Sequence, residues 1–197
     1  MRFWGKGCAL LLGMCVMLVN PMDAAAPPET KFGHYHYQQA PAAELADAGP
    51  YRQTGRIVKL RGEAAAAFRA MAAAAKKDGV ELMPISGFRT VAYQQGLFQN
   101  AAKRYGSEQA AAKWVAPPGY SEHHTGWTLD VGDGAAPETD VKPSFEKTAA
   151  SRWLTQHAAE FKFEMSFPKD NAQGVNPEPW HWRWVGSDAA RETFHPQ

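Results

Sequence analysis

The sequence predicts an α+β domain in which helices pack on a small, mainly antiparallel sheet. Residues 63–77 are alanine-rich and carry apolar side chains at helical spacing. Residues 127–131 and 180–184 instead alternate apolar and polar side chains, as strands with one buried face do. The chain has 197 residues and no internal repeat, which is enough for one sizeable core but not for two.

The N-terminal 26 residues differ in composition from the rest of the chain. Arg2 and Lys6 precede an apolar run at 8–19, and alanines follow at 24–26, which is the pattern of a secretory signal peptide. The run is shorter than the roughly 20 residues that a helix needs to cross a bilayer; a retained anchor is the alternative. We therefore expect residues 1–26 to be cleaved, and the exported protein to act in the periplasm or cell envelope with no stable membrane span.

The chain beyond residues 1–26 contains no cysteine, so it can form no disulfide and has no cysteine nucleophile. Residues 27–55 are rich in proline, alanine and polar residues without a sustained period, which predicts an extended N-terminal arm before a domain at 56–197. His34 and His36 could chelate a metal together. Because no third ligand is near them in the sequence, we favour a surface or packing role.

The first predicted helix, 63–77, leads into a short strand. Phe68 and Met71 form its buried stripe, and Gly79 stands where a left-handed residue commonly ends a helix. Residues 81–85 then read as a strand.

Three further helices are predicted after this strand. Thr90 is placed to cap a helix that extends to about residue 104. A third helix is expected at 107–114 and a fourth at 145–160. The face that we expect the Thr90-capped helix to bury comprises Tyr93, Leu97 and Ala101. In the fourth helix, the expected buried residues are Trp153, Leu154 and Phe161.

The two alternating segments each carry a residue that can bind a metal, on the face opposite their apolar side chains. These residues are Asp130 and His181. His123 lies seven residues before Asp130, so the two could share one ion only if the chain turns between them. We expect this turn at Thr125 and Gly126. Two imidazoles and one carboxylate around zinc leave a position for water, which is the ligand set of a hydrolytic site.

A carboxylate beside such a metal could accept a proton from water as that water attacks a carbonyl. Glu178 is the candidate, three residues before His181, and the prolines at 177 and 179 can bend the chain so that both side chains point the same way. Taken singly, each of these residues also fits a satisfied core or surface position, so the residues alone leave both explanations open.

Three blocks of the sequence resemble signatures of the VanY-type D-alanyl-D-alanine carboxypeptidases, in the family order. Residues 121–130, Ser-Glu-His-His-Thr-Gly-Trp-Thr-Leu-Asp, resemble Ser-x-His-x-x-Gly-x-Ala-x-Asp. Residues 178–182, Glu-Pro-Trp-His-Trp, resemble Glu-x-Trp-His. Residues 86–90, Ser-Gly-Phe-Arg-Thr, with Tyr-Gln at 93–94, resemble the Ser-Gly-Tyr-Arg-Ser segment. The resemblance covers about residues 60–186.

The resemblance implies a site on the sheet face with one zinc ion, bound by His123, Asp130 and His181, and with Glu178 as general base. It also implies that Arg89 contacts the substrate carboxylate or the developing oxyanion, which suits a guanidinium that can bind two oxygens. Further candidates for hydrogen bonds to the substrate or to the metal ligands are Ser86, Gln94 and Ser121; local capping or turn roles are the alternative for the two serines.

The resemblance implies a zinc carboxypeptidase that removes the terminal D-alanine from peptidoglycan stem peptides. An L,D-carboxypeptidase or an endopeptidase of the same fold would keep the same metal residues, because pocket loops choose the scissile bond. A non-catalytic cell-wall-binding module is the alternative from a different class; Glu178 argues against it, since a binder needs no base. A net charge of +1 without a long basic run argues against nucleic acid as a partner.

Overall fold

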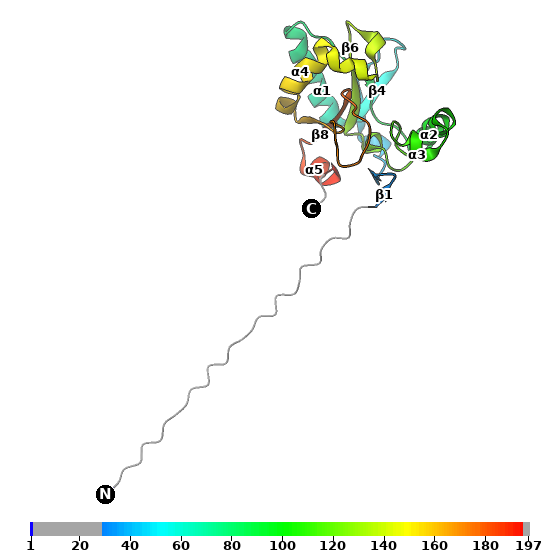
Figure 1. The fold of residues 1–197 in the computed structure, drawn as a ribbon. Helices are drawn as coiled ribbons and strands as arrows, with labels where there is room; N and C mark the ends of the chain where they lie inside the picture. Colours follow the sequence, from blue (N-terminus) through cyan, green and yellow to red (C-terminus); the bar gives the residue numbers. More distant parts are fainter. Residues whose placement is uncertain (2–28, 195–197) are drawn as a thin grey trace.

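A four-stranded antiparallel sheet lies at the centre of the fold (Figure 1). The computed structural model describes residue 1 and residues 29–194. With helices packed around this sheet, the predicted α+β class is confirmed. In spatial order the strands are β5 (Leu82–Ser86), β6 (Thr128–Asp133), β8 (His181–Trp184) and β7 (Phe163–Met165).

The register of the central strands places three chemically important residues in a row. Asp130 of β6 is paired with His181 of β8, and on its other side with Ser86 of β5. Directly paired residues on neighbouring strands point to the same face of a sheet. The sheet therefore carries these polar side chains on one face.

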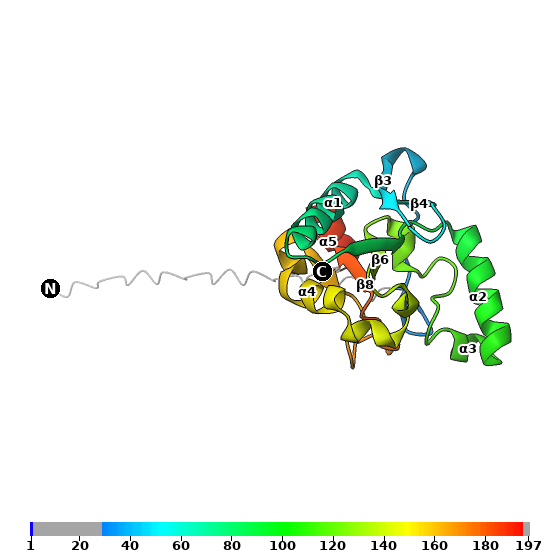
Figure 2. The same ribbon diagram turned by 90° about the horizontal axis from the view of Figure 1, so that it is seen from above.

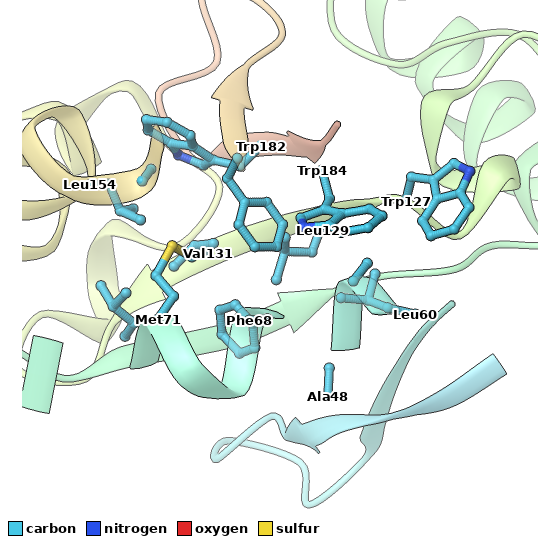
Figure 3. Packing of buried hydrophobic residues seen from close by; sticks show 14 of the residues in the cluster. Ala48, Leu60, Phe68, Met71, Trp127, Leu129, Val131, Leu154, Trp182 and Trp184 are labelled. Atoms are coloured by element: carbon cyan, nitrogen blue, oxygen red, sulfur yellow. The ribbon is translucent and has the colours of Figure 1, made fainter. Parts of the chain in front are cut away.

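The opposite face of β6 is packed into the core. Figure 3 shows Phe68 and Met71 of helix α1 (Gly62–Lys77) beside Leu129 and Val131 of this strand. All four side chains are almost completely buried. Burial of such side chains favours the folded state by about 1.5–3 kcal/mol each, so this side of β6 is committed to the core.

Helix α1 and helix α4 (Ala149–His157) lie together, whereas α2 (Val91–Tyr105) and α3 (Glu108–Ala111) lie at the other end of the molecule (Figures 1 and 2). The prediction of α1 is confirmed, and Gly79 adopts the expected left-handed conformation with φ of 78°.

The buried face of α2 differs from the predicted one. Thr90 does cap this helix, since its side chain accepts a hydrogen bond from the backbone of Tyr93. The Tyr93 side chain, however, is 61% exposed, and the buried face is formed by Gln94, Phe98 and Ala101. The prediction for Tyr93 was wrong because α2 packs on α3 through Phe98 and Ala101, which turns Tyr93 away from the fold.

Two predicted helices are shorter than expected. The one at 107–114 is limited to α3, and the one at 145–160 is divided by Thr148. The Thr148 side chain accepts a hydrogen bond from Ser151 N–H and so starts a new helix there. The resulting pieces are η4 (Pro143–Lys147), α4 and η5 (Ala158–Phe161). Trp153 and Leu154 are buried as predicted, whereas Phe161 is only half-buried.

Much of the segment 27–55 is built into the fold. It contributes the hairpin β1 (Thr30–Lys31) and β2 (His34–Tyr35), the turn η1 (Ala42–Glu44) and strand β3 (Leu45–Pro50). Strand β3 pairs with β4 (Ile57–Arg61) and places Ala48 in the core. The described part of this segment is thus integral to the fold rather than an arm outside it.

The structure describes more of the C-terminal end of the chain than of the N-terminal end. Helix α5 (Asp188–Phe194) follows the last strand and buries Phe194. The predicted signal peptide, apart from Met1, lies outside the described residues. Within residues 29–194, none of the helices has the length and apolar character that crossing a membrane requires.

Candidate active site

The structure brings His123, Asp130 and His181 together. One ligand atom from each of them lies within 4.8 Å of the others, and all three side chains are buried. His123 comes from η2 (Glu122–Thr125), a single helical turn that ends at Gly126. Gly126 has φ of 71°, a left-handed conformation that lets the chain turn back into β6. The predicted turn between His123 and Asp130 therefore exists.

Each imidazole has one nitrogen bound elsewhere and the other directed to the cluster. His123 Nδ1 lies 2.7 Å from the Gly87 carbonyl oxygen, and its Nε2 lies 3.3 Å from Asp130 Oδ1. His181 Nε2 lies 3.0 Å from Glu122 Oε2, and its Nδ1 lies 3.3 Å from the same Asp130 oxygen. An acceptor at one ring nitrogen leaves a lone pair on the other, which is how histidines are held at metal sites. The donor set of two imidazoles and a carboxylate fits one zinc ion.

The charges around His181 also favour a cation. Burial lowers the pKa of His181, but its hydrogen bonds to Asp130 and Glu122 outweigh burial and raise this pKa to about 10. The carboxylates thus stabilise positive charge at this point of the site, and a bound divalent metal would supply such charge.

Glu178 lies beside the cluster, with its Oε2 3.5 Å from His181 Nδ1. The backbone bends as expected between the two residues, because His181 N–H donates to the Glu178 carbonyl oxygen. Burial raises the pKa of Glu178 to about 7, and the negative charge of Asp130 contributes. A carboxylate with a pKa near neutrality is well suited to accept and return a proton.

Arg89 lies against Asp130 and Ser86. Its Nη2 is 2.5 Å from Asp130 Oδ2, and its Nε donates to Ser86 Oγ at 2.9 Å. The guanidinium therefore binds Oδ2 of Asp130, whereas the two imidazoles contact Oδ1. Ser86 in turn fixes the guanidinium.

All the predicted site residues except Ser86 line one cavity of about 420 Å³. Gln94 is buried in its wall and donates through Nε2 to the Ala116 carbonyl oxygen. Its Oε1 is buried with no hydrogen-bond partner among the described residues. Ser121 lines the cavity at the start of η2. The cavity is thus continuous from the metal-competent cluster to helix α2.

Three of the other described histidines, His34, His36 and His124, have structural contacts. His34 is buried in the cavity wall, where its Nε2 lies 2.8 Å from the Ala112 carbonyl oxygen, and His36 is exposed and packs edge-on against Tyr120. His124 points away from the cluster, and its Nε2 accepts a hydrogen bond from Gly119 N–H.

Glu122 is a site residue that sequence reasoning missed. It is fully buried and contacts His181, a residue 59 positions away in the chain. Burial alone would raise its pKa, but His181, Arg183 and Ser166 lower it to about 2. The one local signal was a carboxylate directly before a candidate ligand.

The His-Asp-His cluster is buried, opens to a cavity and lies beside a carboxylate of raised pKa. This arrangement is typical of the active site of a metal-dependent hydrolase. The chain belongs to the VanY D-alanyl-D-alanine carboxypeptidase family, whose family model matches residues 57–187.

Individual relatives agree with this assignment. The putative carboxypeptidase YodJ of Bacillus subtilis is 37% identical over 135 residues, which are 67% of this chain and 48% of YodJ. The structure of the LD-carboxypeptidase LdcB has 33% identity and a TM-score of 0.67, covering 81% of this chain and 73% of LdcB. A D,D-pentapeptidase VanY from a VanB-type resistance cassette, solved with Zn(II), has 26% identity and a TM-score of 0.60. The match covers 84% of this chain and 94% of that VanY chain. The chain spans about half the length of the curated relatives it matches.

Proposed function

We propose that this protein is a zinc-dependent carboxypeptidase that removes the terminal D-alanine from peptidoglycan stem peptides. The observation that carries the proposal is the convergence of His123, Asp130 and His181 at one end of a cavity, with Glu178 beside them. Membership of the VanY family supports the choice of substrate.

His123, Asp130 and His181 would hold the zinc ion, which is also the metal in the matched VanY structure. When bound, zinc supplies Lewis acidity that polarises the scissile carbonyl and makes water more acidic. Glu178 would accept a proton from the attacking water and pass it to the departing amine, as its pKa of about 7 allows.

Arg89 would bind the substrate carboxylate or the developing oxyanion. Its contacts with Asp130 and Ser86 hold the guanidinium at the cavity before substrate arrives, which reduces the entropy cost of binding. Gln94 and Ser121 would contribute hydrogen bonds from the cavity wall, and Ser86 would act through Arg89.

The proposed substrate lies outside the cytoplasm, so the activity requires export. The signal-peptide pattern of residues 1–26 and the family's substrate both support a location in the periplasm or cell envelope.

Cleavage of a different stem bond is the second candidate. An L,D-carboxypeptidase activity is favoured by the match to LdcB, which has higher identity and a higher TM-score than the match to the zinc-containing VanY. The metal residues would serve either reaction equally. An endopeptidase would use the same residues, and a non-catalytic wall-binding module is disfavoured by the buried position of Glu178 at the cluster.

The test is digestion of purified stem pentapeptide and tetrapeptide by zinc-loaded protein, followed by mass spectrometry. Loss of one D-alanine from the pentapeptide alone is the expected result. Cleavage confined to the tetrapeptide would assign the L,D activity instead. Zinc-loaded protein that binds wall fragments but cleaves neither peptide would reject the carboxypeptidase proposal.

A further inference from the structure

Glu122 contacts His181, one of the proposed metal ligands, on the side of the ring that faces away from the cluster. Its carboxylate is buried, and Oε2 lies 3.0 Å from His181 Nε2, the ring nitrogen directed away from the cluster. The other ring nitrogen, Nδ1, lies 3.3 Å from Asp130 Oδ1. His181 therefore stands between two carboxylates, one within the cluster and one behind it.

The Glu122 carboxylate is itself held from three sides. Ser166 Oγ donates to Oε2 at 2.5 Å, and Arg183 Nη1 donates to Oε1 at 2.9 Å. The Tyr37 hydroxyl lies 3.5 Å from Oε1. Because these donors come from three separate segments of the chain, the carboxylate has little freedom to leave His181.

We propose that Glu122 is a positioning residue that fixes the ring orientation and tautomer of His181. An ionised carboxylate can only accept hydrogen bonds, so it requires the proton of His181 on Nε2. The lone pair then lies on Nδ1, the nitrogen that faces Asp130 and the proposed zinc position. This role rests on the proposed metal site and adds a residue to it that does not itself touch the ion.

The same contacts predict what an isosteric amide would do. In the Glu122→Gln protein, Arg183 can only donate, so the amide oxygen should turn to Arg183 and leave the amide NH₂ group facing His181. Two donors would then face each other unless the His181 proton moved to Nδ1, where it would block the metal. Replacement of such outer partners of metal-binding histidines typically lowers metal affinity by about 10–100-fold.

The experiment compares the zinc affinity of full-length wild-type and Glu122→Gln proteins by competition with a chelator. Glu164→Gln is the matched control, because Glu164 is the second carboxylate that accepts from Arg183, through Nε of that guanidinium at 2.7 Å. We expect a loss of about 10–100-fold for Glu122→Gln and less than about threefold for Glu164→Gln. Equal affinity in wild-type and Glu122→Gln proteins would overturn the proposal.

Nitrogen-15 NMR of the zinc-loaded wild-type protein tests the tautomer without any substitution. The expected signature is a slowly exchanging proton on His181 Nε2, with Nδ1 unprotonated. A His181 ring with its proton on Nδ1 would contradict the proposal even if Glu122→Gln failed to fold. Failure of wild-type protein to bind zinc would count against the proposed function itself, whereas zinc binding with the wrong tautomer would count against Glu122 alone.

Discussion

Asp130 and His181 are paired directly across strands β6 and β8, and Asp130 Oδ1 lies 3.3 Å from His181 Nδ1. The register of the sheet therefore sets the distance between two of the proposed ligands. A slip by one residue would turn His181 to the opposite face and bring Trp182 in its place. The buried indoles of Trp182 and Trp184 resist such a slip, since it would expose them. Packing on one face of the sheet thus maintains the chemistry on the other.

Replacing Glu178 with glutamine should separate metal binding from turnover. The amide cannot accept the proton of the attacking water, so we expect a rate loss of about 10²–10⁴-fold with zinc content unchanged. Zinc analysis and D-alanine release from pentapeptide measure the two quantities. Retention of full activity would show that another group is the base.

Removing zinc with a chelator and replacing one of its ligands should both leave the protein without its metal. Chelation should abolish activity and added zinc should restore it, and His123→Ala should prevent zinc binding. The neighbouring His124→Ala is the matched control, because both ring nitrogens of His124 contact backbone atoms, those of Gly119 and Arg89, and its loss should leave zinc content intact. Equal zinc loss in both variants, with both proteins folded by circular dichroism, would contradict the assignment of His123.

The rate should fall at acidic pH. Glu178 must be ionised to act as a base, and its pKa is raised to about 7 by burial, so the active fraction increases with pH through this region. Because a bound cation favours the ionised carboxylate, the rise in kcat/KM should be centred at or below about pH 7. Zinc content measured at each pH shows whether metal loss contributes. A zinc-loaded protein whose kcat/KM does not fall as the pH is lowered from about 8 to about 4 would argue against Glu178 as the base.

Replacing Arg89 with lysine keeps the charge but removes the fork that contacts both Asp130 and Ser86. Loss of a hydrogen bond to a charged group costs about 1.5–3 kcal/mol, which predicts a decrease in kcat/KM of roughly 10–100-fold. Arg152→Lys on the exposed side of α4 is the control and should be neutral. A normal kcat/KM for Arg89→Lys would leave Arg89 with a packing role only.

Two aromatic residues of α2 should respond differently to truncation. Phe98 is 4% exposed and Tyr93 is 61% exposed. Phe98→Ala should lower the free energy of unfolding by about 3–5 kcal/mol, whereas Tyr93→Ala should change it by less than about 0.5 kcal/mol. Urea denaturation of the two variants measures the difference. A larger effect for Tyr93 would restore the face predicted from the sequence.

Elements with a local pattern could be predicted from the amino-acid sequence. The alternation at 127–131 and 180–184 and the helical spacing at 63–77 each identified an element of the fold. Such periods reflect backbone geometry over a few residues, so they can be read without knowing what the segment packs against. The same segments supplied the side chains of Asp130 and His181, together with the blocks that indicate the family.

Which faces and segments meet could be learned from the three-dimensional fold but not from local patterns. Three features depend on partners that are distant in the chain. They are the orientation of α2 that buries Phe98, the pairing of β3 with β4, and the contact of Glu122 with His181. No local period encodes these contacts, because they follow from packing of whole elements against one another. The sequence pattern thus identified the candidate metal ligands, and long-range packing set their distances and orientations.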